Sequence, residues 1–73
     1  MMHVQVELFV TLRQKRIQDV TLPDGSDAKT LIDQLGIPLE EIGLLSVNKQ
    51  LATLDQQLEE GDVIYMMPPI GGG

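Results

Sequence analysis

The segment VQVELFVTL (residues 4–12) alternates between apolar and polar side chains. Successive side chains of a strand point to opposite faces of a sheet, so this alternation predicts a strand with one buried face and one open face. The face predicted to be buried consists of Val4, Val6, Leu8, Val10 and Leu12. On the other face the only large apolar residue is Phe9, the single phenylalanine of the chain, and it lies between the polar residues Glu7 and Thr11.

The residues after this strand predict a hairpin followed by one helix. Residues 13–16 are polar and predict a turn, and residues 17–22 predict a second strand. We expect a bulge in that strand because Ile17 and Val20 are out of phase. Ser26 or Asp27 is a suitable N-cap for a helix that Gly36 would end. The apolar face of this helix consists of Ala28, Leu31, Ile32 and Leu35.

Two further strands are predicted in the second half of the chain, over residues 44–47 and 63–67. Between them, Leu54 and Leu58 are expected to anchor a turn. The order strand, strand, helix, strand, strand predicts an α+β domain with one mixed sheet and the helix packed across one of its faces. Among the small α+β topologies that share this order, we favour the ubiquitin-like β-grasp fold. The domain would comprise residues 1–67, and residues 68–73 would form a tail.

Size and charge restrict the classes of function. The chain has 73 residues, no cysteine and a formal net charge of −6, which predicts one small domain without a disulfide or a thiolate metal site. Residues 31–73 contain seven acidic residues and one basic residue, Lys49. A nucleic-acid partner is therefore not expected, and a basic protein partner fits better, unless these carboxylates only keep turns hydrated. Because no apolar stretch is long enough to span a membrane, we expect a soluble, cytoplasmic protein.

The sequence contains no recognisable catalytic constellation. Its one histidine, His3, is expected to be exposed at a frayed strand start. Neither a nucleophile elbow nor a phosphate-binding glycine loop is present. We therefore expect that the protein is not an enzyme by itself, and that it holds neither a metal nor a cofactor.

The segment PPIGGG (residues 68–73) is the most distinctive part of the sequence. Its two prolines restrict φ and favour an extended arm directed away from the domain. The three glycines lack a Cβ, so such an arm could enter a narrow channel of another protein. The carboxylate of Gly73 would be an anion at neutral pH and would need activation, for example as an acyl adenylate. Without a cysteine, any sulfur on this chain would be carried as a thiocarboxylate; the alternative is an inert tail.

Three stretches of the sequence resemble the MoaD/ThiS family of β-grasp sulfur carriers: VELFVTLR (residues 6–13), VNKQL (47–51) and LEEGDVIYMMPPIGGG (58–73). The resemblance spans essentially the whole chain. The LFVTLR motif and the double proline favour MoaD, the small subunit of molybdopterin synthase, over the carriers of the thiamine pathway. One departure is that VNKQL has no glycine after Asn48, which weakens a thiamine-type assignment.

This resemblance implies that a ubiquitin-activating-like enzyme uses ATP to adenylate Gly73, and that a sulfur donor system converts it to a thiocarboxylate. The tail would then enter the large subunit of molybdopterin synthase, in a heterotetramer of two small and two large subunits, and sulfur would pass to the pterin precursor. The residues that would thread into the partner are Pro68, Pro69, Ile70, Gly71 and Gly72. Partner docking would use an apolar patch at Phe9, Leu51 and Met67, and Arg13 would pair with an acidic group of the activating enzyme.

Phe9 supports a docking role independently of the resemblance, because a monomer gains nothing from exposing it on a polar face. The alternative is that the protein's own tail or a turn covers it. Three other functions also remain open. The sulfur could go to thiamine thiazole, an amino acid or a tungsten cofactor, Gly73 could form isopeptide bonds as in a ubiquitin-like modifier, or the chain could be an interaction module with an inert tail.

Overall fold

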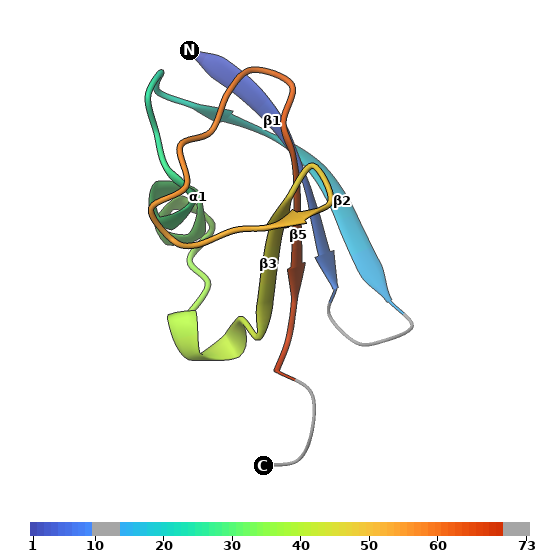
Figure 1. Ribbon diagram of the computed structural model, residues 1–73. Coiled ribbons are helices and arrows are strands. Elements are labelled where there is room, and N and C mark those ends of the chain that lie inside the picture. Colours follow the sequence, from blue (N-terminus) through green and yellow to red (C-terminus); the bar gives the residue numbers. More distant parts are fainter. Residues whose placement is uncertain (10–13, 70–73) are drawn as a thin grey trace.

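A computed structural model describes residues 1–9 and 14–69 of the chain. In these residues five strands form one sheet, and one α-helix and one short 3-10 helix accompany it (Figure 1). The elements follow the chain as β1 Met2–Phe9, β2 Lys15–Leu22, α1 Ala28–Leu35, the 3-10 helix η1 Leu39–Glu41, β3 Leu44–Val47, β4 Gln50–Leu51 and β5 Val63–Met67.

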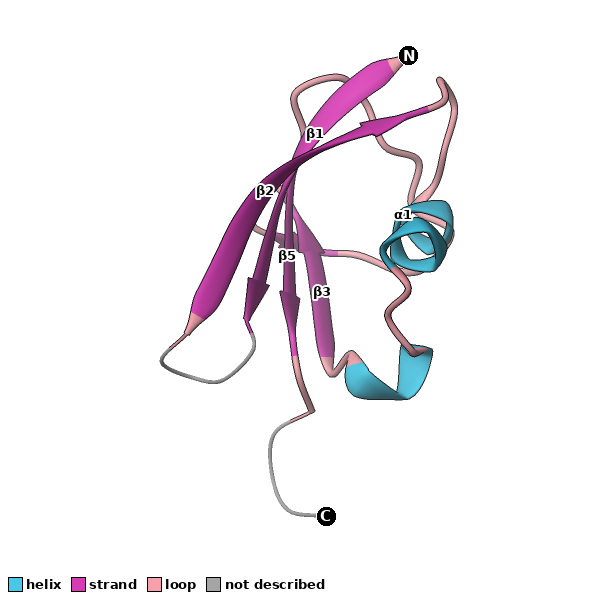
Figure 2. Ribbon diagram, turned by 180° about the vertical axis from the view of Figure 1, so that it is seen from behind, coloured by secondary structure: helices cyan, strands magenta, loops and turns pink. Residues whose placement is uncertain are grey.

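The sheet is mixed, as the element order predicts. Its strand order is β2-β1-β5-β3-β4, with β1 and β5 parallel at the centre and the other neighbours antiparallel. A parallel pair needs a long connection between its strands, and here that connection includes α1. Figure 2 shows α1 on one side of the sheet, while no described helix covers the opposite side. We call this opposite side the open face.

The hairpin of β1 and β2 corrects one prediction. Its register runs without interruption from Met2 paired with Leu22 to Phe9 paired with Lys15, so the expected bulge is absent from the described ladder. Ile17 and Val20 are out of phase for a simpler reason: they lie on opposite faces of a regular strand. β1 also begins earlier than predicted, at Met2, and its predicted end over residues 10–12 lies outside the described residues.

The helix forms as its capping residues predict. Asp27 is the N-cap, and its Oδ1 accepts hydrogen bonds from the N–H and the hydroxyl of Thr30 at 2.9 and 2.8 Å. These bonds stabilise the carboxylate and lower the pKa of Asp27. Gly36 ends the helix in the left-handed conformation at φ 72°, which glycine adopts without a Cβ penalty.

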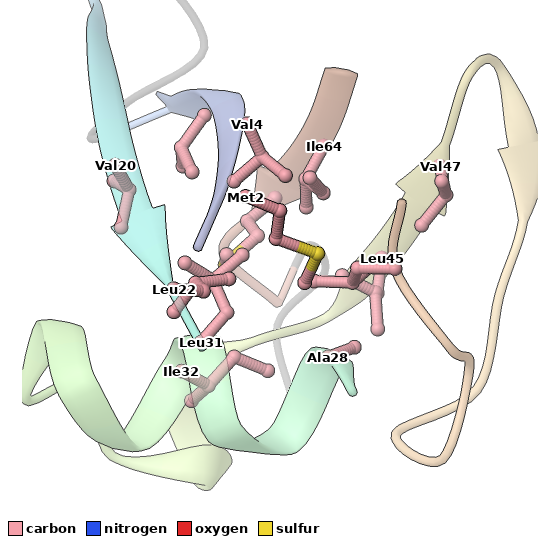
Figure 3. Packing of buried hydrophobic residues seen from close by; sticks show 13 residues of the cluster. Met2, Val4, Val20, Leu22, Ala28, Leu31, Ile32, Leu45, Val47 and Ile64 are labelled. Atoms are coloured by element: carbon pink, nitrogen blue, oxygen red, sulfur yellow. The ribbon is translucent and has the colours of Figure 1, made fainter. Parts of the chain in front are cut away.

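The core lies between α1 and the sheet (Figure 3). Its buried side chains are Met2, Val4, Val6, Val20, Leu22, Ala28, Leu31, Ile32, Leu45, Val47, Leu58, Ile64 and Met66. Leu58 is buried as predicted, but Leu54 is 39% exposed, so its predicted role as an anchor is wrong. The backbone of Leu54 makes the contact instead, because its carbonyl accepts a hydrogen bond from the Lys29 N–H at the start of α1.

The sequence did not predict η1, β4 or the conformation of the turn between β3 and β4. Asn48 and Lys49 occupy this turn at φ 52° and 71°, as in the tight turns that suit the twist of a hairpin. The Asn48 amide donates to Asp62 Oδ1 and its oxygen accepts from the Val63 N–H, both at 2.9 Å. The turn is thus tied to the start of β5. Neither described helix is long and apolar enough to cross a membrane.

Candidate functional site

The open face is built from the outward side chains of all five strands. Strand register aligns one row directly across the sheet, because Glu7 pairs with both Ile17 and Tyr65, and Ser46 pairs with both Tyr65 and Leu51. From one edge to the other this row reads Ile17, Glu7, Tyr65, Ser46 and Leu51. Residues far apart in the sequence therefore form one continuous surface.

The open face carries more apolar surface than the outward side of a sheet needs. Leu51 is 80% exposed, Ile17 is 55% exposed and Leu44 is 39% exposed. Phe9, Tyr65 and Met67 are half-buried on the same face. Exposed apolar side chains gathered on one face are typical of interaction surfaces.

We predicted a docking patch that consists of Phe9, Leu51 and Met67. All three residues lie on the open face. Their role in docking stays a prediction. The sequence reasoning missed Ile17, Leu44 and Tyr65. A signal for Ile17 was present, since the phase shift that we interpreted as a bulge is what an outward apolar residue produces.

The open face also carries an ion pair. Lys15 Nζ lies 2.9 Å from Glu7 Oε1, and Glu7 is only 9% exposed. The hydrogen bond from Lys15 lowers the pKa of Glu7, against the opposing effect of desolvation, and the same bond raises the pKa of Lys15. The open face is therefore not the fully hydrated side that the alternation predicts.

Neighbouring side chains of the open face cover part of the Phe9 ring. Its ring stacks on Tyr65 with centroids 5.7 Å apart and an angle of 22° between the planes. Lys15 Nζ lies 5.8 Å from the Phe9 centroid, close enough for a cation–π interaction. Among the described residues, side chains of β2 and β5 therefore contact the ring. The alternative was that the tail or a turn of the protein covers Phe9, and these contacts come from strands instead.

The root of the tail lies at the end of β5, next to the open face. The carbonyl of Met67, the last residue of β5, accepts a hydrogen bond from the Gly43 N–H at 2.8 Å. Pro68 and Pro69 follow, and together with Leu8, Phe9, Ile37, Glu40 and Glu41 they line a groove. Figure 1 shows the chain leaving the sheet at the end where η1 lies. Arg13, Ile70, Gly71, Gly72 and Gly73, which we also predicted to be functional, lie outside the described residues.

His3 and the described acidic residues do not form a metal centre. His3 is exposed, as expected, but it lies within β1 paired with Thr21, and not at a frayed end. Its backbone N–H donates to Glu60 Oε1 at 3.0 Å, and its Nδ1 lies 3.3 Å from the same oxygen. No three histidine or acidic side chains of residues 1–9 and 14–69 are grouped so that they could hold a metal ion.

Comparison with known proteins places the chain in a family. The sequence model of the ThiS family matches residues 6–73. The chain belongs to this family. The resemblance to MoaD/ThiS carriers that the motifs indicated is therefore confirmed, while a search of curated protein sequences gives no match.

Solved structures confirm the ubiquitin-like β-grasp fold. A Pyrococcus furiosus protein assigned as molybdopterin converting factor subunit 1 has a TM-score of 0.73 and 23% identity, over 96% of this chain and 100% of that chain. SAMP1 from Haloferax volcanii has a TM-score of 0.75 and 20% identity, over 97% and 99%. A complex of subunits 1 and 2 of the molybdopterin-converting factor from Helicobacter pylori 26695 contains a chain with a TM-score of 0.70 and 26% identity, over 99% and 100%.

Proposed function

We propose that this protein is a sulfur carrier that provides a thiocarboxylate for molybdopterin biosynthesis, as the small subunit of molybdopterin synthase. The observation that carries the proposal is the family match, which continues through the terminal glycines to residue 73. The geometry of the tail root supports it. Met67 of the open face directly precedes Pro68, so a partner bound to that face lies close to the start of the tail.

The chemistry needs only the carboxyl group of Gly73 and two reagents that other proteins supply. The carboxylate attacks the α-phosphorus of ATP, pyrophosphate leaves and an acyl adenylate forms. A hydrosulfide equivalent from a sulfur donor system then attacks the carbonyl carbon, AMP and a proton leave, and sulfur has replaced one oxygen. No side chain of glycine shields the carbonyl from either reagent. A ubiquitin-activating-like enzyme would bind the ATP, so the carrier itself needs no cofactor.

The partner that receives the sulfur is, in this proposal, the large subunit of molybdopterin synthase. The support is the Helicobacter pylori complex, in which a chain 26% identical to this one is assembled with a second subunit. We propose that the open face docks on the large subunit in a heterotetramer of two small and two large subunits. Residues 1–67 would act as the docking domain and residues 68–73 as the tail that enters the active site. Arg13 would pair with an acidic group of the activating enzyme.

Intact mass spectrometry tests the first half of the proposal. The protein is incubated with ATP, its activating enzyme and a sulfide donor, and we expect a mass increase equal to the replacement of oxygen by sulfur. Gly73→Ala and a variant with one residue added after Gly73 serve as matched controls, and both should lose most of this increase. An unchanged wild-type mass would refute the carrier function, and large adducts on lysines would instead indicate a protein modifier.

The sulfur acceptor is tested separately. The thiocarboxylated protein is mixed with the molybdopterin synthase large subunit and the pterin precursor, or with the thiazole-forming enzyme of thiamine biosynthesis and its substrates. We expect loss of the sulfur and formation of product only in the first mixture. Product formation in the second mixture alone would assign the carrier to the thiamine pathway.

A further inference from the structure

Gly43 lies between η1 and β3, where the chain that leaves β5 passes close by. A Cβ added to Gly43 would lie 2.5 Å from the Cα of Pro69, 2.7 Å from its N and 2.9 Å from the carbonyl oxygen of Pro68. Distances below 3.0 Å are essentially never seen for a real Cβ, and all three neighbours are backbone atoms, which cannot rotate away. Glycine is therefore required at position 43 because there is no space for a side chain.

The other described glycines are required for a different reason. Gly25, Gly36 and Gly61 have φ values of 83°, 72° and 85°, and a Cβ on any of them would meet nothing within 4 Å. Gly43 has no such φ. Among the glycines in the described part of the chain, it alone is needed because another segment of the backbone passes where a side chain would be.

Packing against Gly43 matters because the backbone hydrogen bonds of the sheet no longer hold the root of the tail beyond Met67. The sheet pairing of β5 with β3 ends at Met67, and Pro68 and Pro69 lack the N–H groups that would extend it. Two consecutive prolines also fix φ at both positions, so the backbone of the root has few ways to adjust to a displacement. The hydrogen bond from the Gly43 N–H to the Met67 carbonyl and the close approach of Pro69 to Gly43 thus help to fix where the chain leaves the sheet.

We propose that Gly43 is a positioning residue for sulfur transfer: its bare backbone holds Pro68 and Pro69 so that the carboxyl end is presented to the partner's active site in one direction. This inference rests on the proposed carrier function. A Cβ at position 43 would lie 2.5 Å from the Pro69 Cα, and an ordinary contact needs at least 3.4 Å, so the root would be displaced by about 1 Å. A mutation far from the chemistry that causes a misplacement of about 1 Å can lower a rate on the order of 100-fold.

The test compares Gly43→Ala with Gly25→Ala. Both substitutions add one methyl group, but Gly25 lies in open space at φ 83°, so its variant suffers backbone strain without touching the tail. The initial rate of thiocarboxylation is measured as a function of carrier concentration for both variants and the wild type. For Gly43→Ala we expect an unchanged KM, because the open face is intact, and a kcat lowered roughly 10- to 100-fold. Gly25→Ala should lower the unfolding temperature and keep the wild-type kcat.

Two further measurements separate positioning from general damage. In the wild type, NMR should detect a nuclear Overhauser contact between the Gly43 and Pro69 α-protons, which Gly43→Ala should lose while the core signals stay in place. A Pro69→Gly background releases φ at the root, so Gly43→Ala should cost much less there than in the wild type.

Each outcome decides the matter. If Gly43→Ala keeps the wild-type kcat, or if Gly25→Ala loses as much as Gly43→Ala, the positioning role is wrong while the carrier function stands. If the wild type itself gains no sulfur, the carrier function is wrong and the positioning role falls with it.

Discussion

Leu51 offers a sharp test of the open face as a docking surface. Its side chain is 80% exposed at the edge of the sheet, so the folded monomer gains little from it. Replacing it by aspartate should change the free energy of unfolding by no more than about 0.5 kcal/mol, as is usual for exposed positions. The protein should therefore keep its fold while the open face loses its most exposed apolar side chain.

The effect on binding follows from the exposed fraction. Complete burial of a leucine side chain stabilises by about 1.5–3 kcal/mol. Since 80% of Leu51 is available to a partner, its burial in a complex contributes about 1.2–2.4 kcal/mol. With a factor of ten for every 1.4 kcal/mol, this corresponds to an affinity loss of about 7- to 50-fold. Desolvation of the new carboxylate adds to that loss.

Isothermal titration calorimetry with the activating enzyme and with the large subunit measures the effect, and thermal unfolding checks the fold. Leu54→Asp is the matched control, because Leu54 is apolar and 39% exposed but lies in the loop that contacts the start of α1. We expect the control to bind both partners with wild-type affinity. Binding of Leu51→Asp within twofold of the wild type for both partners, or equal weakening by Leu54→Asp, would refute docking through this face.

Three further predictions concern the same face and its supporting turn. Phe9→Asp should keep the fold, because the ring is half-buried against Tyr65 and Lys15 and not in the core, and should weaken partner binding; circular dichroism showing an unfolded chain would contradict this. Lys49→Gly should stabilise the protein by about 0.5–1 kcal/mol, because Lys49 has a φ of 71°. The steric cost of a side chain in this left-handed region exceeds the conformational entropy that glycine loses on folding. A lower unfolding temperature of the variant would contradict this prediction. The lowered pKa of Glu7 means that its pairing with Lys15 stabilises the fold fully above the ordinary value of 4.5 and progressively less as the pH falls below it. Glu7→Gln should therefore unfold more easily than the wild type at neutral pH and approach it in acid, and a constant difference from pH 7 to pH 3 would rule out this coupling.

Several elements could be predicted because their causes are local. The alternation in β1, the caps of α1 at Asp27 and Gly36, and the bounds of β3 and β5 each depend on residues close together in the sequence. The β-grasp order follows from these elements, since the connection through α1 allows β5 to pair in parallel with β1.

Other predictions were wrong because the cause of the observed structure lies in a distant segment of the chain. We interpreted the phase shift between Ile17 and Val20 as a bulge, but the strand register shows that Ile17 points outward from a regular strand. Leu54 was expected to anchor a turn with its side chain, but that side chain is partly exposed and its carbonyl accepts a hydrogen bond from the backbone of α1. Glu7 was expected in water, yet Lys15 pairs with it from the neighbouring strand and Tyr65 lies beside it from β5.

By itself the sequence determined which segments become strands and helix, which faces are apolar, and that a proline and glycine tail follows the last strand. Only the tertiary structure decided which outward residues share one surface and why Gly43 has no side chain. The reason is physical: propensity, periodicity and capping act over a few residues, whereas strand register and the space left beside a passing backbone depend on segments that meet only after folding.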